Sequence, residues 1–267
     1  MWLGYNTNGF AHHRLDDAIR ILADLGYEGV AVTLDYHSLD PFDPATPREA
    51  ERIRRLLDDL RMKCVVETGA RFLLDARRKH QPTLISPTPD DRDRRLEFLR
   101  RSIELAAILG SDVVSFWSGT PADDAGPAEW MRRLVDGCRS LGTRLAFEPE
   151  PGMFIDTMER FAELHDRVNR PNFGLTLDIG HLQCLGEFPI RDHIVRWHNK
   201  LWNVHIEDMK QGKHDHLMFG EGDIDFAEVF AALREIGYDG GVCVELSRHS
   251  HDAVETARRS IAFLRQF

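Results

Sequence analysis

The strongest constraint on the fold is an alternation of apolar runs and amphipathic stretches that occurs eight times along the chain. Each apolar run is typical of a buried strand, and the stretch after it repeats its apolar residues at helical spacing. Alternating strands and helices predict a parallel sheet, and eight such units in 267 residues match a closed (β/α)8 TIM barrel. The predicted strands are 2–5, 29–34, 63–67, 112–117, 144–148, 173–178, 201–208 and 240–245. The predicted helices are 15–26, 47–61, 90–110, 128–140, 157–168, 189–197, 225–237 and 252–267.

The chain has no low-complexity linker and no shift in composition, so residues 1–267 are expected to form one barrel domain. Its 34 Lys and Arg against 44 Asp and Glu give a formal net charge of −10. This balance argues against nucleic-acid binding through a basic surface. No apolar run approaches the roughly 20 residues of a membrane span, so no membrane partner is expected.

The N-terminal residues lack a basic region followed by an apolar stretch, so no secretory signal is visible. The four cysteines are scattered without a CxxC pair, which is typical of free thiols in a reducing compartment. We therefore expect a cytoplasmic protein, and a homo-oligomer is compatible with the sequence.

Two connections, 68–89 and 207–224, are unusually long for a compact domain. Connections of this length are usually functional or disordered. Both follow the C-terminal end of a predicted strand, which is the face where barrel enzymes build their active sites.

Residues whose side chains can ligate a metal stand at or near the ends of the last four predicted strands. They are Glu148, Asp178, His205 and Glu245, spaced 30, 27 and 40 residues apart, close to one strand–helix unit each. In a barrel they would converge on one point, and two glutamates, an aspartate and a histidine suit a divalent metal such as Mn²⁺ or Mg²⁺. A single acid at a strand end is more often a helix N-cap or a surface residue. Four in register on consecutive strands are hard to reach by accident.

The motifs around these residues resemble the sugar isomerase and epimerase branch of the xylose isomerase-like TIM barrels. This branch includes ketose 3-epimerases, hydroxypyruvate isomerases and inosose dehydratases. The resemblance spans nearly the whole chain and rests on "LAFEPEPG" (145–152), "LTLDIGH" (175–181), "NVHIED" (203–208), "FGEGDIDF" (219–226) and "VCVEL" (242–246).

The resemblance implies a role for each matching residue. Glu148, Asp178, His205 and Glu245 would ligate the metal, the two glutamates would also transfer the proton, and His181 would bind substrate. The ion would be Mn²⁺, Mg²⁺, Co²⁺ or Zn²⁺. One metal is expected, because the third and fourth strands add no histidine at their ends, although a second at His181 and His216 is left open.

Further residues are candidates for contact with substrate. Arg71, Lys79 and His80 in the connection 68–89 could bind a phosphate or carboxylate, or could equally be surface charges on a solvated lid. Lys213 stands near the place where ketose epimerases carry a substrate-holding arginine. Trp117 could stack on a sugar or simply pack, and Glu150 could bind substrate or cap a helix; His216 completes the candidate set.

The sequence thus predicts a metal-dependent isomerase or epimerase of a small polyhydroxylated carbonyl compound, a sugar or sugar phosphate. The metal would stabilise an enediolate, and Glu148 and Glu245 would remove and return the proton. A lyase like the inosose dehydratases, or a barrel that binds a sugar-like metabolite without turnover, remains an alternative.

Overall fold

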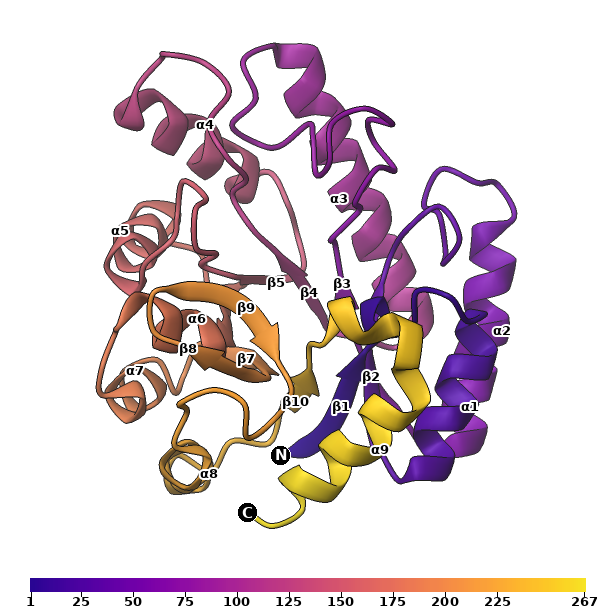
Figure 1. Ribbon diagram of the computed structural model, residues 1–267. Helices are drawn as coiled ribbons and strands as arrows, with labels where there is room; N and C mark the ends of the chain where they lie inside the picture. Colours follow the sequence, from indigo (N-terminus) through magenta and orange to yellow (C-terminus); the bar gives the residue numbers. More distant parts are fainter.

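Eight parallel strands close into a barrel in the computed structural model, which describes residues 1–267 (Figure 1). The order around the barrel is β1–β10–β7–β6–β5–β4–β3–β2, and β1 closes it by pairing with both β10 and β2. The predicted TIM barrel is therefore confirmed. The strands are β1 (Trp2–Asn6), β2 (Gly29–Thr33), β3 (Lys63–Glu67), β4 (Val113–Phe116), β5 (Arg144–Phe147), β6 (Phe173–Asp178), β7 (Leu201–Ile206) and β10 (Gly241–Val244).

Helices surround the barrel, and the last of them lies beside the first, so the two ends of the chain are neighbours (Figure 1). None of the helices is long and apolar enough to cross a membrane. The α-helices are α1 (Leu15–Leu25), α2 (Thr46–Leu60), α3 (Pro89–Leu109), α4 (Pro127–Arg139), α5 (Met158–Val168), α6 (Ile179–Leu185), α7 (Ile190–Arg196), α8 (Phe226–Glu235) and α9 (Ala253–Leu264). Two short 3₁₀-helices are η1 (Thr7–Phe10) and η2 (Ser247–Asp252).

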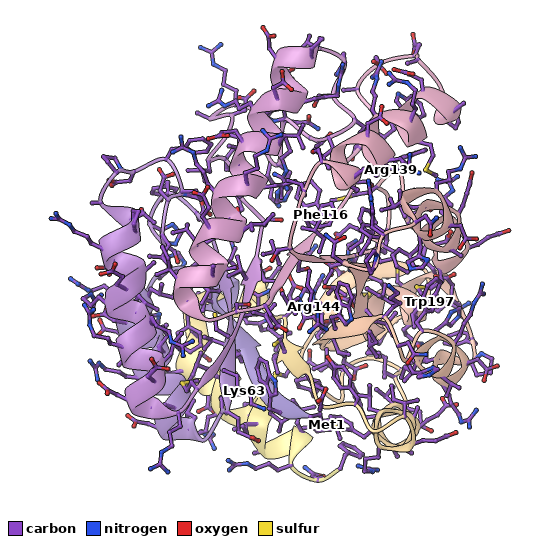
Figure 2. All side chains as sticks on the ribbon, turned by 180° about the vertical axis from the view of Figure 1, so that it is seen from behind. Met1, Lys63, Phe116, Arg139, Arg144 and Trp197 are labelled. Carbon is purple, nitrogen blue, oxygen red and sulfur yellow. The ribbon has the colours of Figure 1, made fainter.

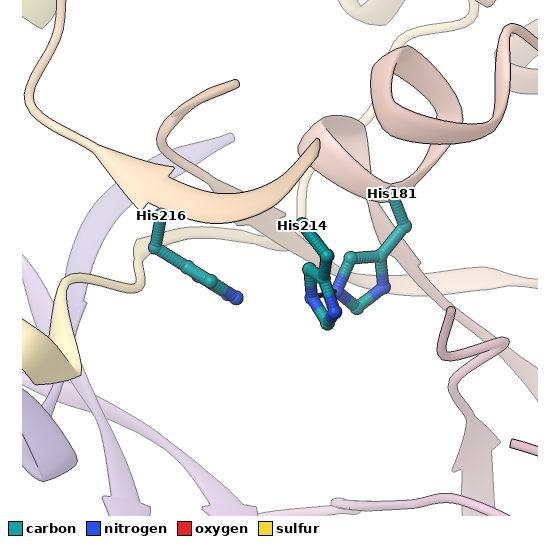
Figure 3. Close-up of side chains that lie close together, drawn as sticks. All are labelled: His181, His214 and His216. Carbon is teal, nitrogen blue, oxygen red and sulfur yellow. Dashed lines mark hydrogen bonds between the residues drawn. The ribbon is translucent and has the colours of Figure 1, made fainter. Parts of the chain in front are cut away.

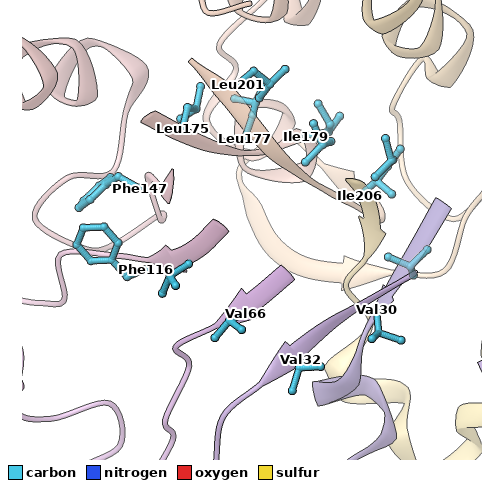
Figure 4. Close-up of a cluster of buried hydrophobic side chains, with 14 of the residues drawn as sticks. Val30, Val32, Val66, Phe116, Phe147, Leu175, Leu177, Ile179, Leu201 and Ile206 are labelled. Atoms are coloured by element: carbon cyan, nitrogen blue, oxygen red, sulfur yellow. The ribbon is translucent and has the colours of Figure 1, made fainter. Parts of the chain in front are cut away.

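Side chains alternate between the inside of the barrel and the surrounding helices, because successive residues of a strand point to opposite faces. The outward residues are large and apolar, and they form the main core with the helices (Figure 4). Figure 4 labels several of them: Val30, Val32, Val66, Phe116, Phe147, Leu175, Leu177 and Ile206.

The inward residues change character along the barrel. At its base, where the strands begin, they are apolar and form a separate small cluster of Trp2, Ala31, Val65, Val113, Ala146 and Cys243. Trp2 fits there because glycines surround it: a Cβ on Gly29 would lie 2.3 Å from the Trp2 ring. Lys63 and Arg144, which begin β3 and β5, mark this end of the barrel in Figure 2.

Helix α6 and the hairpin after β7 were not expected from the sequence. Helix α6 starts directly after β6 because the Asp178 carboxylate accepts a hydrogen bond from the backbone N–H of His181, which is N-capping geometry. The long connection after β7 contains an antiparallel hairpin of β8 (Asp208–Lys210) and β9 (Lys213–Leu217). Gly212 closes its turn with a φ of 74°, a conformation that favours glycine.

Candidate active site

Four side chains from consecutive strands converge at the C-terminal mouth of the barrel, as the sequence predicted. Asp178 and His205 are paired in register on β6 and β7. Glu148 and Glu245 directly follow β5 and β10, and their amides still donate to the neighbouring strands. Each of the four offers one atom within 4.8 Å of the others. We call this set the four-residue centre.

His205 is held between carboxylates on both sides of its ring. Its Nδ1 lies 2.9 Å from Oε1 of Glu148 and 2.9 Å from Oε2 of Glu245. Its Nε2 lies 3.0 Å from Oε1 of Glu67, and Asn203 donates to the same glutamate oxygen at 3.0 Å. Burial by itself would lower the pKa of His205, but the surrounding carboxylates outweigh it and hold that pKa well above its usual value. A metal bound at Nδ1 would leave Nε2–H to donate to Glu67, the usual second-shell arrangement for a histidine ligand.

Asp178 unites the two roles that the sequence left as alternatives. Its Oδ1 accepts the N-cap hydrogen bond from His181 at 2.9 Å, so it is a helix cap. Its Oδ2 is buried and has no hydrogen-bond partner. An unpartnered buried carboxylate oxygen is costly unless a cation or donor meets it. The free oxygen therefore fits a metal ligand.

The two glutamates of the centre have different surroundings. Burial raises the pKa of Glu148 to about 8, although His205 opposes the rise. Burial also acts to raise the pKa of Glu245, but His205 and other neighbours reverse the effect and hold it well below its usual value. Asn8 contributes by donating from Nδ2 to Oε1 of Glu245 at 2.9 Å. Paired carboxylates with opposite shifts are suited to acid and base roles.

A cavity of about 220 Å³ lies over the four-residue centre, and we call it the mouth cavity. Only Trp117 and Met153 among its 20 lining residues are hydrophobic. Most ligand pockets are lined mainly by apolar side chains, so this one is unusually polar. Its surface suits a ligand that offers many hydroxyl, carbonyl or charged oxygens.

Comparison with known proteins places the chain in a family. The sequence profile of the xylose isomerase-like TIM barrel matches residues 19–267. The chain belongs to this family. A curated relative, L-ribulose-5-phosphate 3-epimerase UlaE of Shigella flexneri serotype 5b (strain 8401), is 25% identical over 240 residues, which cover 86% of this chain and 81% of the relative.

Solved structures share the fold of this xylose isomerase-like barrel. D-allulose 3-epimerase from Methylomonas sp., in complex with D-allulose, has a TM-score of 0.75 at 21% identity over 100% of this chain and 96% of that one. The IolI protein, solved with a bound zinc atom, has a TM-score of 0.76 at 19% identity over 99% and 98% of the two chains.

The predicted substrate contacts separate into two groups in this xylose isomerase-like barrel. Arg71, Trp117, Glu150 and His216 line the mouth cavity, together with Lys79 and His80. Lys213 does not, which corrects the sequence prediction. Its side chain is 68% exposed and pairs with Asp215 at 2.7 Å, because its place on β9 directs it to solvent.

His181, His214 and His216 form a three-histidine group (Figure 3). The group lies beside the four-residue centre, because Nε2 of His181 is 3.5 Å from Oδ2 of Asp178. The Nε2 atoms of His181 and His214 are 3.1 Å apart. Nδ1 of His181 lies 3.0 Å from the Pro149 backbone oxygen, and Nδ1 of His216 lies 3.0 Å from that of Glu245, so in both rings Nδ1–H donates. Nε2 of His181 therefore accepts from Nε2–H of His214, whereas the Nε2 lone pair of His216 remains free, and the group could hold a ligand or an ion.

Sequence reasoning missed three polar residues around the four-residue centre. Asn8 holds Glu245, and Asn203 holds Glu67 beside His205. Glu207 is fully buried, and neither of its carboxylate oxygens has a hydrogen-bond partner. Asn203 stands two residues before His205 and therefore points into the barrel with it, which is a signal that strand alternation could have supplied. Asn8 lies in a 3₁₀-helix, where no comparable periodicity marks it.

Proposed function

We propose that this protein is a divalent-metal-dependent isomerase or epimerase of a small polyhydroxylated carbonyl compound, acting through an enediolate. The observation that carries the proposal is the convergence of Glu148 and Glu245 on one imidazole nitrogen of His205, each at 2.9 Å. The names of its relatives support it, because UlaE is a ketose-phosphate 3-epimerase and the allulose enzyme is a ketose 3-epimerase.

The donor set fits a metal ion. Carboxylate oxygens of Glu148, Asp178 and Glu245 and one nitrogen of His205 would hold it, and the free Oδ2 of Asp178 is a ready ligand atom. Three oxygen donors to one nitrogen favour Mn²⁺ or Mg²⁺, while Co²⁺ and Zn²⁺ are also accommodated by such ligands. A divalent ion bound there would supply Lewis-acid stabilisation of the negative charge that develops on the substrate oxygens.

The two glutamates would move the proton. One carboxylate takes it from the carbon next to the substrate carbonyl, which leaves an enediolate. If the other glutamate returns it to the opposite face of that carbon, the product is an epimer. If the proton returns to the neighbouring carbon, the carbonyl moves and the product is an isomer. Asn8 and His205 hold the carboxylates in place for both outcomes.

Solvent exchange tests this proposal directly. The protein is incubated in deuterated water with a panel of ketoses, aldoses and their phosphates, and the products are analysed by mass and by NMR. We expect deuterium at the carbon next to the carbonyl in at least one substrate, with no other change in mass. Loss of one water would instead identify a dehydratase, and sugar binding without exchange would identify a binding protein.

Metal content is the second test. Protein purified without chelator should hold about one divalent metal per chain, as the four-residue centre implies. Chelation should abolish exchange, and adding the metal back should restore it. Two metals per chain would overturn the single-metal expectation and assign the second ion to the three-histidine group.

A further inference from the structure

Two cationic side chains on the wall of the mouth cavity have no carboxylate partner. Arg71 and Lys79 both come from the connection between β3 and α3, and neither takes part in an ion pair. The remaining arginine of the cavity wall, Arg248, is already paired with Asp215. The uncompensated positive charge on the cavity surface therefore comes from a single connection.

Arg71 is linked to Glu245, one of the two proposed proton-transfer residues, through a single intervening residue, Asn8. Its Nη2 donates to the backbone oxygen of Asn8 at 3.2 Å, and the Asn8 side chain donates to Glu245 at 2.9 Å. A substrate whose reacting carbon meets Glu245 would thus have its other end within reach of the guanidinium. Arg71 and Lys79 thus line the same cavity as the carboxylates of Glu148 and Glu245.

The connection that carries the cations is fixed at its base. Thr68 donates from Oγ1 to the backbone oxygen of Ser115 at 2.7 Å. Nδ1 of His80 lies 2.8 Å from the backbone oxygen of Gly69, and the His80 amide donates to the backbone oxygen of Arg71 at 2.6 Å. The backbone that carries the two cations is therefore held in position before binding, which reduces the conformational entropy lost when a ligand arrives.

A third cation, Arg95, is buried behind the connection that carries Arg71 and Lys79. Arg95 is 1% exposed and has no carboxylate partner; Nη2 donates to the backbone oxygen of Thr68 at 3.2 Å, and Nη1 has no partner. The carbon of its guanidinium lies 5.0 Å from the ring centroid of Phe98 and 4.7 Å from that of Trp117, which lines the cavity. Burial lowers the pKa of Arg95 to about 9, so the group is still charged at neutral pH. A buried, unpaired positive charge makes the potential on this side of the cavity more positive.

We propose that the substrate carries a phosphate monoester at the end remote from its reacting carbon, bound by Arg71 and Lys79. This rests on the proposed function for the reacting end, but the phosphate subsite is separate from the four-residue centre. A phosphate dianion matches two free cations, and a planar guanidinium can bind two of its oxygens at once. A carboxylate at the same place would use the same cations and is an alternative outcome of the test.

The kinetic experiment compares matched substrates. Values of kcat/KM are measured for each ketose and its terminal phosphate, and for a ketose acid of equal length. We expect the phosphate ester to be preferred at least about tenfold, mainly through a lower KM, because it alone forms the charge-assisted hydrogen bonds. Equal efficiency on the free ketose would overturn the proposal, and preference for the acid would replace phosphate by carboxylate.

Variants distinguish the loss of a phosphate contact from general damage to the protein. Arg71→Ala should remove most of the preference for the ester over the free ketose, and Arg71→Lys should restore part of it. Arg77→Ala removes the same charge from the same connection at an exposed position outside the cavity, so it should leave the preference unchanged. An equal loss on both substrates in Arg71→Ala would show a positioning role through Asn8 and would contradict a phosphate contact.

A binding measurement keeps this inference distinct from the proposed reaction. Calorimetric titration of chelator-treated protein with inorganic phosphate should show binding that Arg71→Ala weakens and Arg77→Ala does not. Such binding in a protein that turns over no carbonyl compound would defeat the proposed function alone. Turnover of ketoses without phosphate binding or ester preference would defeat this inference alone.

Discussion

The two ends of the barrel hold hollows of very different kinds. The hollow at the base is the larger, about 430 Å³ against about 220 Å³ at the mouth, and half of its 18 lining residues are hydrophobic. Four of its six charged residues are paired, Arg54 with Asp58 at 2.8 Å and Arg144 with Asp112 at 2.6 Å, which leaves only Lys63 and Asp239 unpaired. The smaller hollow instead gathers carboxylates and histidines around unpartnered buried atoms. Convergence of uncompensated polar groups, and not size, marks the candidate site.

The same strands contribute inward side chains to both the base and the mouth of the barrel. On β5 the inward residue is Ala146 near the base, and the next inward residue is Glu148 at the mouth. On β10 the corresponding pair is Cys243 and Glu245, and both first members belong to the apolar base cluster. Two residues along a strand span about 7 Å, which is enough to pass from close packing into a polar cavity. Variants at the two ends should therefore affect different properties.

The largest effect is expected at the base. Trp2→Ala removes a ring that is 6% exposed and packed against Gly4, Gly29 and Gly241. The loss of a buried tryptophan should cost about 3–5 kcal/mol of unfolding free energy. In a chain of this size the melting temperature would fall by roughly 6–20 °C. Thermal unfolding measures the predicted fall in melting temperature. The kcat of the folded variant should stay unchanged. Loss of kcat would show that packing at the base also supports the active site.

Glu245→Gln is the matched change at the mouth. It keeps the size and one oxygen but removes the base, so turnover should fall at least about 100-fold, equivalent to about 2.7 kcal/mol. Metal occupancy should fall only in part, because Glu148, Asp178 and His205 remain. The measurement is deuterium exchange at saturating metal, alongside a melting curve that should move less than that of Trp2→Ala. Exchange at the wild-type rate would mean that Glu245 does not carry the proton.

A smaller effect is expected at Glu67, which is outside the four-residue centre but contacts His205. Glu67→Gln keeps an acceptor for Asn203 but removes the charge that faces Nε2 of His205. Loss of such a second-shell carboxylate typically costs about 10–100-fold in metal affinity. Titration of the chelated variant with metal measures it. An unchanged affinity would argue against His205 as a ligand through Nδ1.

The smallest effect is expected at Lys213, which the sequence placed near the substrate and the structure places in solvent. Lys213→Ala should change stability by no more than about 0.5 kcal/mol, as is usual for a surface substitution. KM should stay within about twofold of wild type, since no contact with the cavity is lost. A large rise in KM would return Lys213 to the site and would require the hairpin of β8 and β9 to move.

Much of this protein could be predicted from the sequence alone. The alternation of strand and helix patterns determined the barrel, because periodicity records which side of each element is buried. The order of the units then placed Glu148, Asp178, His205 and Glu245 at one mouth. The metal and proton-transfer roles of these residues remain predictions.

Only the tertiary structure decided how the polar groups are used. The sequence treated Asp178 as either a helix cap or a ligand, whereas its two oxygens are in different surroundings and allow both roles. Two cations from long connections, Arg71 and Lys213, looked alike in sequence but lie in the cavity and in solvent. The physical reason is that a polar side chain is fixed by partners that closure of the barrel brings to it. Asn203 meets Glu67 from 136 positions away, and no local pattern records that contact.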